Sequence, residues 1–254
     1  MNQKILNTIV EWAQHEEAIR TLLLIGSFAR KKKTDELSDY DIALFTNDVK
    51  KYETDDAWIH TLWDVIVYEP CELHRNNKIY QTRLIIYSSP NASNLPLQVD
   101  FTLYDLEYLQ FLEEQKTLPV DFNLGYEVLL DKDGLTKNLQ SPTYEYPYTK
   151  KPTQKEFELA IRIFFFEVFK EAKALVRNDL WHAKVRDWTT KEYLLCMIEW
   201  HEKTKHGWNY DTNCDAKSMQ SWVDKIIWNE AHNIFAPFDA QHSWKALFAN
   251  ICTK

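Results

Sequence analysis

Three aspartates carry the clearest chemical signal in this sequence. Asp39 and Asp41 stand two residues apart at the start of an apolar run that continues to Phe45, and Asp100 lies within a later run, Leu97 to Tyr104. Residues two apart in a strand point to the same face, so Asp39 and Asp41 project together. Neighbouring carboxylates repel each other unless a cation lies between them, and Mg²⁺ prefers such oxygen ligands. We therefore expect these three residues to form a divalent metal site.

A Gly-Ser pair adds a second chemical element. Gly26 and Ser27 directly follow the apolar run Leu22 to Ile25. Glycine allows close approach of the backbone to a ligand, and backbone N–H groups at the start of a helix suit a phosphate. Arg30 follows within the same short helix, where it would steady a phosphate or cap the helix, and both roles remain open. The next residues, Lys31 to Lys33, are expected to form a solvated face.

Periodicity predicts the elements that hold these residues. The last strand alternates cleanly, with Val99, Phe101 and Leu103 on one face and Asp100 on the polar face. Helices are expected over residues 3–18, 27–36 and 55–63, and strands over 21–25, 40–46, 64–68, 82–87 and 97–104.

The second half of the chain has a helical pattern. An aperiodic stretch, 131–152, reads as a linker, and a capping box at Thr153 and Glu156 begins a long helix. A second Thr-x-x-Glu pattern at Thr189 predicts the start of another helix that ends near His201, followed by helical segments near 216–229 and 243–252. We predict an α+β protein: a mixed sheet flanked by helices over residues 1–135, then an all-helical domain over 150–254.

Composition limits the classes of partner. The net charge is −8, and residues 1–150 hold 15 Lys and Arg against 24 Asp and Glu, which disfavours nucleic acid and suits a small cation. No run of 18 apolar residues is present, and the acidic N-terminus is unlike a signal peptide. The four scattered cysteines lack C-x-x-C spacing and indicate reduced thiols. We expect a cytoplasmic monomer that binds neither membranes nor nucleic acid.

Taken together, these motifs resemble a known family. Gly26-Ser27, Arg30, Asp39-Tyr40-Asp41 and Asp100 resemble the signature of the DNA polymerase β-like nucleotidyltransferases. Within that superfamily, essentially the whole chain resembles the aminoglycoside 6-adenylyltransferases, also called streptomycin adenylyltransferases. Further segments in the family's order are Val99 to Leu103, Pro152-Thr153 with Glu156-Phe157, Ala172-Lys173 with Arg177, and Leu194-Leu195 with Met197 to His201.

The resemblance implies an activity and a set of site residues. The activity is Mg²⁺-dependent transfer of AMP from ATP to a hydroxyl of an aminoglycoside such as streptomycin, with release of pyrophosphate, which confers antibiotic resistance. The domain 1–135 would catalyse transfer, and the helical domain 150–254 would help bind the acceptor. The implied catalytic and metal-binding residues are Asp39, Asp41 and Asp100, and the implied nucleotide-binding residues are Gly26, Ser27, Arg30, Lys173 and Arg177.

Several roles stay open at this stage. Lys173 and Arg177 lie one helical turn apart, and they either reach the nucleotide or are surface charges of an amphipathic helix. The family's Asn-Glu pair in the first helix of the second domain reads Arg162-Ile163 here, and its later Gly-Lys reads Ala216-Lys217. A cation at Arg162 favours a nucleotidyltransferase that acts on a different small-molecule or protein acceptor. A nucleotide-binding module without turnover is a third reading, which the three intact acids argue against.

Two other patterns suggest structure rather than chemistry. His201 and His206 are five residues apart, whereas a zinc-binding H-E-x-x-H helix requires four, so they are expected to be surface histidines. Most tryptophans of the second half are expected in the core: Trp181, Trp188, Trp200, Trp222, Trp228 and Trp244.

Overall fold

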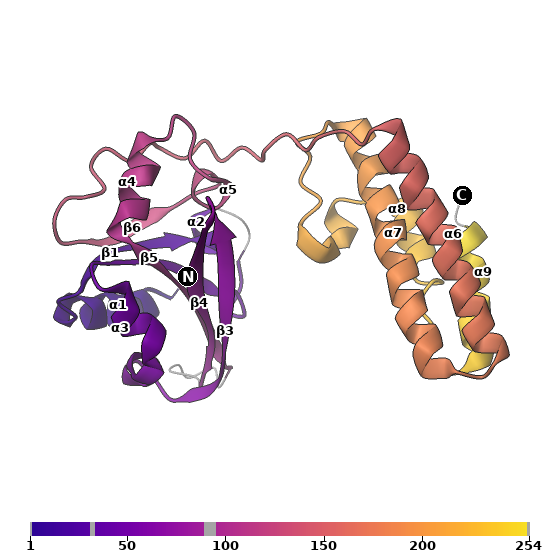
Figure 1. The fold of residues 1–254 in the computed structure, drawn as a ribbon, viewed down its shortest axis with the longest axis horizontal. Coiled ribbons are helices and arrows are strands. Elements are labelled where there is room, and N and C mark those ends of the chain that lie inside the picture. Colours follow the sequence, from indigo (N-terminus) through magenta and orange to yellow (C-terminus); the bar gives the residue numbers. More distant parts are fainter. Residues whose placement is uncertain (1, 31–33, 89–94, 253–254) are drawn as a thin grey trace. The chain divides into compact units, whose positions relative to one another are not determined.

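The computed structural model describes residues 2–30, 34–88 and 95–252 (Figure 1). Their contacts divide the chain into two compact units, Met1–Glu145 and Tyr146–Lys254. We call these the sheet unit and the helical unit, and each is described in its own frame. The α+β class expected from the sequence is confirmed, because a mixed sheet precedes a region of helices.

The sheet unit contains a six-stranded sheet in the order β3-β4-β5-β2-β1-β6. Its strands are β1 (Ile19–Ile25), β2 (Tyr40–Thr46), β3 (Val65–Arg75), β4 (Lys78–Tyr87), β5 (Leu97–Asp105) and β6 (Glu127–Asp131). The pair β2–β5 is parallel and the other described pairs are antiparallel. The parallel pairing matters for function, because it brings the first residues of β2 and β5 to the same edge of the sheet.

Helices cover both faces of the central strands, which explains why β1 and β2 are apolar at almost every position. One face packs against α1 (Gln3–His15), α3 (Val49–Thr54) and the 3₁₀ helix η1 (Asp56–Thr61). The other face, which includes Leu23, Ala43 and Phe45, packs against α4 (Leu106–Glu114) and α5 (Val120–Asn123). The short helix α2 (Gly26–Ala29) connects β1 to the segment before β2.

The helical unit is built on two long neighbouring helices, α6 (Gln154–Val176) and α7 (Leu180–His206) (Figure 1). Both pack against α9 (Ala240–Cys252). The shorter elements are η2 (Cys214–Ala216), η3 (Met219–Ser221) and α8 (Lys225–Ala231). The predicted capping box at the start of α6 is confirmed: Glu156 N–H donates to the Thr153 side chain, and the Glu156 carboxylate accepts from Thr153 N–H.

Two expected helix boundaries are wrong. The Thr189 pattern does not begin a helix, because α7 starts after Asp179 and continues through this position. Thr189 and Thr190 donate their hydroxyl protons to Val185 and Arg186 carbonyls one turn earlier, so their polar groups are satisfied inside the helix. The helix expected over 27–36 is too long: α2 ends at Ala29, and Asp35 and Ser38 form a local turn through their side chains, while residues 31–33 lie outside the described ranges.

The sequence analysis missed several helices and strands and assigned some exposed residues to the core. The sequence pattern did not indicate β6, α3 or α4, and it shortened β3 and β4. Of the six tryptophans expected in the core of the helical unit, only Trp222 is fully buried, and Trp181 is 77% exposed.

Cys71 and Cys196 are free thiols. None of the described helices combines the length and apolar character needed to cross a membrane.

Candidate functional site

The register of β2 and β5 places two of the aspartates side by side. Asp41 and Asp100 are direct partners across this parallel pair. Both lie on the sheet face that α4 and α5 cover further along the strands, at Ala43, Phe45 and Tyr104. Asp39 directly precedes β2 and belongs to the same alternation. Neighbouring strands are about 4.8 Å apart, so the structure gathers the predicted acids at one edge of the sheet.

The carboxyl group of Asp100 has a strongly perturbed environment. Burial, together with the negative charges of Asp41 and Asp39, raises its pKa to about 6. Gln98 opposes this shift, because its side-chain amide donates to both carboxylate oxygens of Asp100 at 3.1 Å. Within the described parts of the chain, Asp100 forms no ion pair. A cation would relieve this repulsion, and an all-oxygen donor set suits Mg²⁺, so these residues fit the metal that the family implies.

Gly26 is required by the close approach of α2 to Asp41. It adopts a positive φ of +68°, and a Cβ atom at this position would lie only 1.7 Å from Asp41 Oδ2. A second glycine supports the same turn, because a Cβ on Gly125 would lie 2.4 Å from the Ala29 carbonyl oxygen. The Gly-Ser turn and the carboxylates predicted from the sequence therefore meet, with Ser27 following Gly26 at the start of α2.

Arg30 ends the short helix α2. Its backbone N–H donates to the Gly26 carbonyl oxygen at 3.1 Å, so the helix cap does not use the side chain. The buried side-chain Nε has no hydrogen-bond partner in the part of the chain that the structure describes. A buried donor without a partner is costly, and this favours an anion as its partner over the capping role. The expected solvated face at Lys31 to Lys33 lies outside the described residues.

Lys173 and Arg177 lie together in the helical unit, as their spacing predicts. They line a pocket of about 240 Å³ that is rich in positive charge; its other polar lining residues are Lys170, Asp179, His182 and Arg186. Lys170 and Arg186 are both paired with Glu167, at 2.7 and 3.3 Å. Lys173 and Arg177 form no ion pair with the described residues, so their charge is available to an anion.

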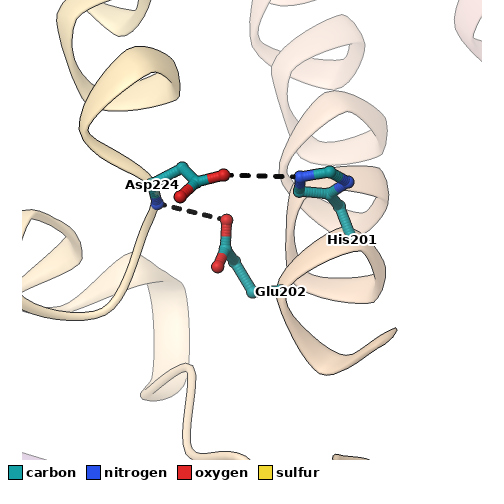
Figure 2. A group of neighbouring side chains, drawn as sticks. All are labelled: His201, Glu202 and Asp224. Carbon is teal, nitrogen blue, oxygen red and sulfur yellow. Dashed lines mark hydrogen bonds and ion pairs between the residues drawn. The ribbon is translucent and has the colours of Figure 1, made fainter. Parts of the chain in front are cut away.

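A third group contains His201, Glu202 and Asp224, whose ligand atoms lie within 4.8 Å of one another (Figure 2). Its side chains already have partners within the protein. Asp224 forms an ion pair with Lys205 and lies 3.6 Å from His201 Nε2, and the buried Glu202 accepts the backbone N–H of Asp224 at 3.1 Å. These contacts link α7 to Asp224, the residue directly before α8. His201 and His206 are exposed, which confirms the expectation of surface histidines.

The residues that depart from the family pattern have local structural explanations. Arg162 is 74% exposed and forms an ion pair with Glu158, one turn earlier on α6, at 3.0 Å. Ala216 adopts a positive φ of 57°, a conformation that favours glycine. The sequence analysis missed Gln98, Gly125 and Arg186. Alternation places Gln98 on the face of Asp100, but tertiary contacts alone reveal the other two.

Comparisons with known proteins give the family of this chain. The family model of streptomycin adenylyltransferase matches residues 1–253. The chain is 25% identical to the aminoglycoside 6-adenylyltransferase of Bacillus subtilis (strain 168) over 248 residues, which cover 97% of this chain and 84% of that protein. It is 24% identical over 250 residues to the aminoglycoside 6-adenylyltransferase of Campylobacter jejuni, with coverages of 96% and 82%.

A solved structure was also matched. The crystal structure of an aminoglycoside 6-adenyltransferase from Bacillus subtilis aligns with a TM-score of 0.41 and 23% identity, covering 99% of this chain and 86% of that one. The family match extends over almost every residue, including both units. The chain therefore belongs to the streptomycin adenylyltransferase family of nucleotidyltransferases.

Proposed function

We propose that this protein transfers AMP from ATP to a hydroxyl group of an aminoglycoside of the streptomycin type and releases pyrophosphate. The observation that carries this proposal is the in-register pair Asp41–Asp100 beside Gly26. Family membership supports nucleotidyl transfer, and the names of the relatives supply the class of acceptor.

The sheet unit holds the phosphates of the nucleotide. Gly26 lacks a side chain where one would collide with Asp41, so α2 begins directly beside this carboxylate. The backbone N–H groups at the start of α2 bind the β- and γ-phosphates. Arg30 donates its buried Nε, which has no partner among the described residues, to a phosphate oxygen. Mg²⁺ held by Asp39, Asp41 and Asp100 would neutralise the triphosphate and polarise the attacking hydroxyl.

Asp100 accepts the proton of the attacking hydroxyl. Without a cation in the site, burial and the charges of Asp41 and Asp39 raise its pKa to about 6. Carboxylates are among the side chains that serve as general bases. Gln98 fixes the orientation of the carboxylate through two hydrogen bonds. The hydroxyl oxygen forms a bond to the α-phosphorus in line with the leaving group, the bond to pyrophosphate breaks, and the proton moves to an Asp100 oxygen. Positioning and charge neutralisation supply most of the rate enhancement.

The cationic pocket of the helical unit binds an anionic part of the nucleotide. Lys173 and Arg177 have no ion-pair partner among the described residues. The pocket that they line also holds Lys170, Arg186 and His182, with Asp179 as the one acid among its described lining residues, and Lys170 and Arg186 are paired with Glu167. Among the groups that take part in this reaction, a phosphate is the anion that cationic side chains bind well. This assignment favours nucleotide binding over the surface-charge reading of the two residues.

A different acceptor is the alternative function. Arg162-Ile163 replaces the Asn-Glu pair of the family, and an added cation disfavours a cationic acceptor. However, Glu158 balances the charge of Arg162, so the aminoglycoside remains the better supported acceptor.

A pyrophosphate-release assay tests the proposal. Purified protein with ATP and Mg²⁺ is offered streptomycin, a second aminoglycoside, an uncharged polyol and a protein acceptor, with Asp41→Asn as the inactive control. Release that depends on streptomycin and is lost in the control supports the proposal. Release with only the uncharged or protein acceptor establishes the alternative, and no release with any acceptor contradicts enzymatic transfer to these classes.

A further inference from the structure

Beside the aspartates, the residues that the structure describes cover one face of the sheet only partly. Glu69 on β3 pairs with Leu84 on β4, and Leu84 pairs with Asp100 on β5. Partners in an antiparallel register share a face, so Glu69, Leu84 and Asp100 form one row across the sheet, which Asp41 continues on β2. This row lies beyond the part of the face that α4 and α5 cover.

The surface between these carboxylates is apolar. Leu84 lies between Glu69 and Asp100, and Ile86 and Val67 occupy the next row on the same face. Leu84 and Ile86 are half-buried, and Val67 is 54% exposed, so this end of the sheet presents carbon surface to its surroundings. A carboxylate at each side of an apolar strip matches a ring-containing molecule that carries positive charge on its periphery.

Glu69 also differs from the other glutamate in the middle of β3. Glu69 forms no ion pair with any residue in the described ranges. Glu72 lies on the opposite face of the same strand and pairs with His74 at 3.5 Å. Cys71 follows Glu69 on the same face of β3. Desolvation raises the pKa of its thiol most, followed by the charge of Glu69, a hydrogen bond with Glu69 and the charge of Asp100. Glu69 therefore belongs to the electrostatic field of the site.

We propose that Glu69 is a specificity-determining residue that binds a cationic group of the acceptor, while a ring of the acceptor lies over Leu84. Two strand spacings separate Glu69 from Asp100, which is about 10 Å, so the bound cation stands away from the hydroxyl that reacts. The ligand class is a polyhydroxylated cation with an ammonium or guanidinium group. This inference rests on the proposed function, because it names the part of the same site that selects the acceptor.

Steady-state kinetics of Glu69→Gln test this role. With streptomycin as acceptor, we expect KM for streptomycin to rise about tenfold, while kcat changes less than about threefold and KM for ATP is unchanged. Glu72→Gln is the matched control, since it removes the same charge from the opposite face of the same strand. Glu69→Asp should restore most of the affinity. Because Glu69 is exposed, the variants should melt at the temperature of the wild type.

Calorimetric binding of streptomycin without ATP gives a readout that does not need turnover. Weaker binding by Glu69→Gln than by Glu72→Gln, with a smaller dependence on salt, supports the proposal. Equal affinities for the wild type and Glu69→Gln overturn it, even if the protein is an active adenylyltransferase. If the wild type binds no aminoglycoside but releases pyrophosphate with an uncharged acceptor, the proposed acceptor class and this inference both fall.

Discussion

The two units differ in which groups of the protein contact their buried carboxylates. In the sheet unit, Asp100 lies beside Asp41 and receives its hydrogen bonds from the neutral amide of Gln98. In the helical unit, Asp187 forms a buried ion pair with Lys191, and Glu167 lies between Lys170 and Arg186. Asp187 and Glu167 thus receive cations from their own unit, whereas Asp100 lacks one among the described residues.

This difference distinguishes carboxylates that stabilise the fold from carboxylates that bind a ligand. A buried carboxylate with a cation from the same chain holds helices together, and removal of one partner leaves a costly uncompensated charge. A carboxylate that lies beside other carboxylates destabilises the unit until a cation binds. Substitution of the clustered aspartates in the sheet unit should therefore affect activity, and substitution of buried carboxylates in the helical unit should affect stability. The following predictions test that division.

The largest effect is expected at the aspartates. Asp41→Asn and Asp100→Asn should each lower turnover by roughly 10²-fold or more, about 3 kcal/mol of transition-state stabilisation, without lowering the melting temperature. Pyrophosphate release and thermal unfolding measure the two quantities, and Glu114→Gln on the exposed surface of α4 serves as the control. Near-normal turnover in either variant would show that the site is assigned to the wrong residues.

The Gly-Ser turn should be the next most sensitive position. Gly26→Ala places a Cβ atom against Asp41 and requires a positive φ, so it should abolish the rise in melting temperature that Mg²⁺-ATP produces. Gly134→Ala is a matched control, because Gly134 has nearly the same φ, +69°, and its nearest neighbour is the flexible side chain of Lys137. An unchanged ATP-dependent shift in Gly26→Ala would move the phosphate site elsewhere.

In the helical unit, Glu171 tests the effect of a buried carboxylate on stability instead of activity. It is fully buried, its Oε2 has no hydrogen-bond partner in the described chain, and burial together with Asp187 raises its pKa to about 8. Lys191 and Lys184 oppose the shift without cancelling it. The folded state therefore holds a proton that the unfolded state releases above its ordinary pKa of 4.5. Stability from this group is complete below pH 4.5 and is lost as the pH rises through about 8.

Glu171→Gln should remove this dependence on pH. Between pH 6 and pH 9, the wild type should lose roughly 2–3 kcal/mol of unfolding free energy that the variant keeps. Urea denaturation at several pH values measures the difference, with the exposed Glu192→Gln on α7 as the control. Turnover per folded molecule should stay the same. Parallel pH profiles for wild type and variant would mean that Glu171 is ionised in the folded protein.

The smallest effect is expected at Arg162. Its ion pair with Glu158 is exposed, and such pairs contribute little. Arg162→Asn should change the free energy of unfolding by less than about 0.5 kcal/mol and turnover with streptomycin by less than about twofold. A large gain in turnover would instead show that Arg162 repels the acceptor, and Glu158→Gln should then lower turnover.

Much of the arrangement follows from local patterns. The apolar runs and Thr153 predicted the central strands and the start of α6, and alternation placed Asp100 on the polar face. The Thr189 pattern gave a wrong helix start. A threonine hydroxyl can cap the start of a helix, but inside a helix it can also donate to a carbonyl of the preceding turn, as Thr189 does. The catalytic roles of the aspartates and of Lys173 and Arg177 stay predictions.

Other features depend on contacts between distant residues. Gly125 is required because it faces Ala29, and no pattern of spacing links these two positions. Glu69 reads as an ordinary surface glutamate until the register of three strands aligns it with Asp100. The exposed Trp181 shows the reverse case, since hydrophobicity alone does not decide which side of a helix is buried.

The position of β6 has a consequence for biogenesis. β1 lies between β2 and β6, yet β6 is formed about a hundred residues later in the chain. While the ribosome synthesises this interval, one edge of β1, with its buried Leu22, Leu23 and Leu24, has no strand to pair with. An apolar strand with an unpaired edge is a template for aggregation. Nascent chains that stop before residue 127 should therefore need chaperones, and slow translation through this interval should reduce the yield of native protein.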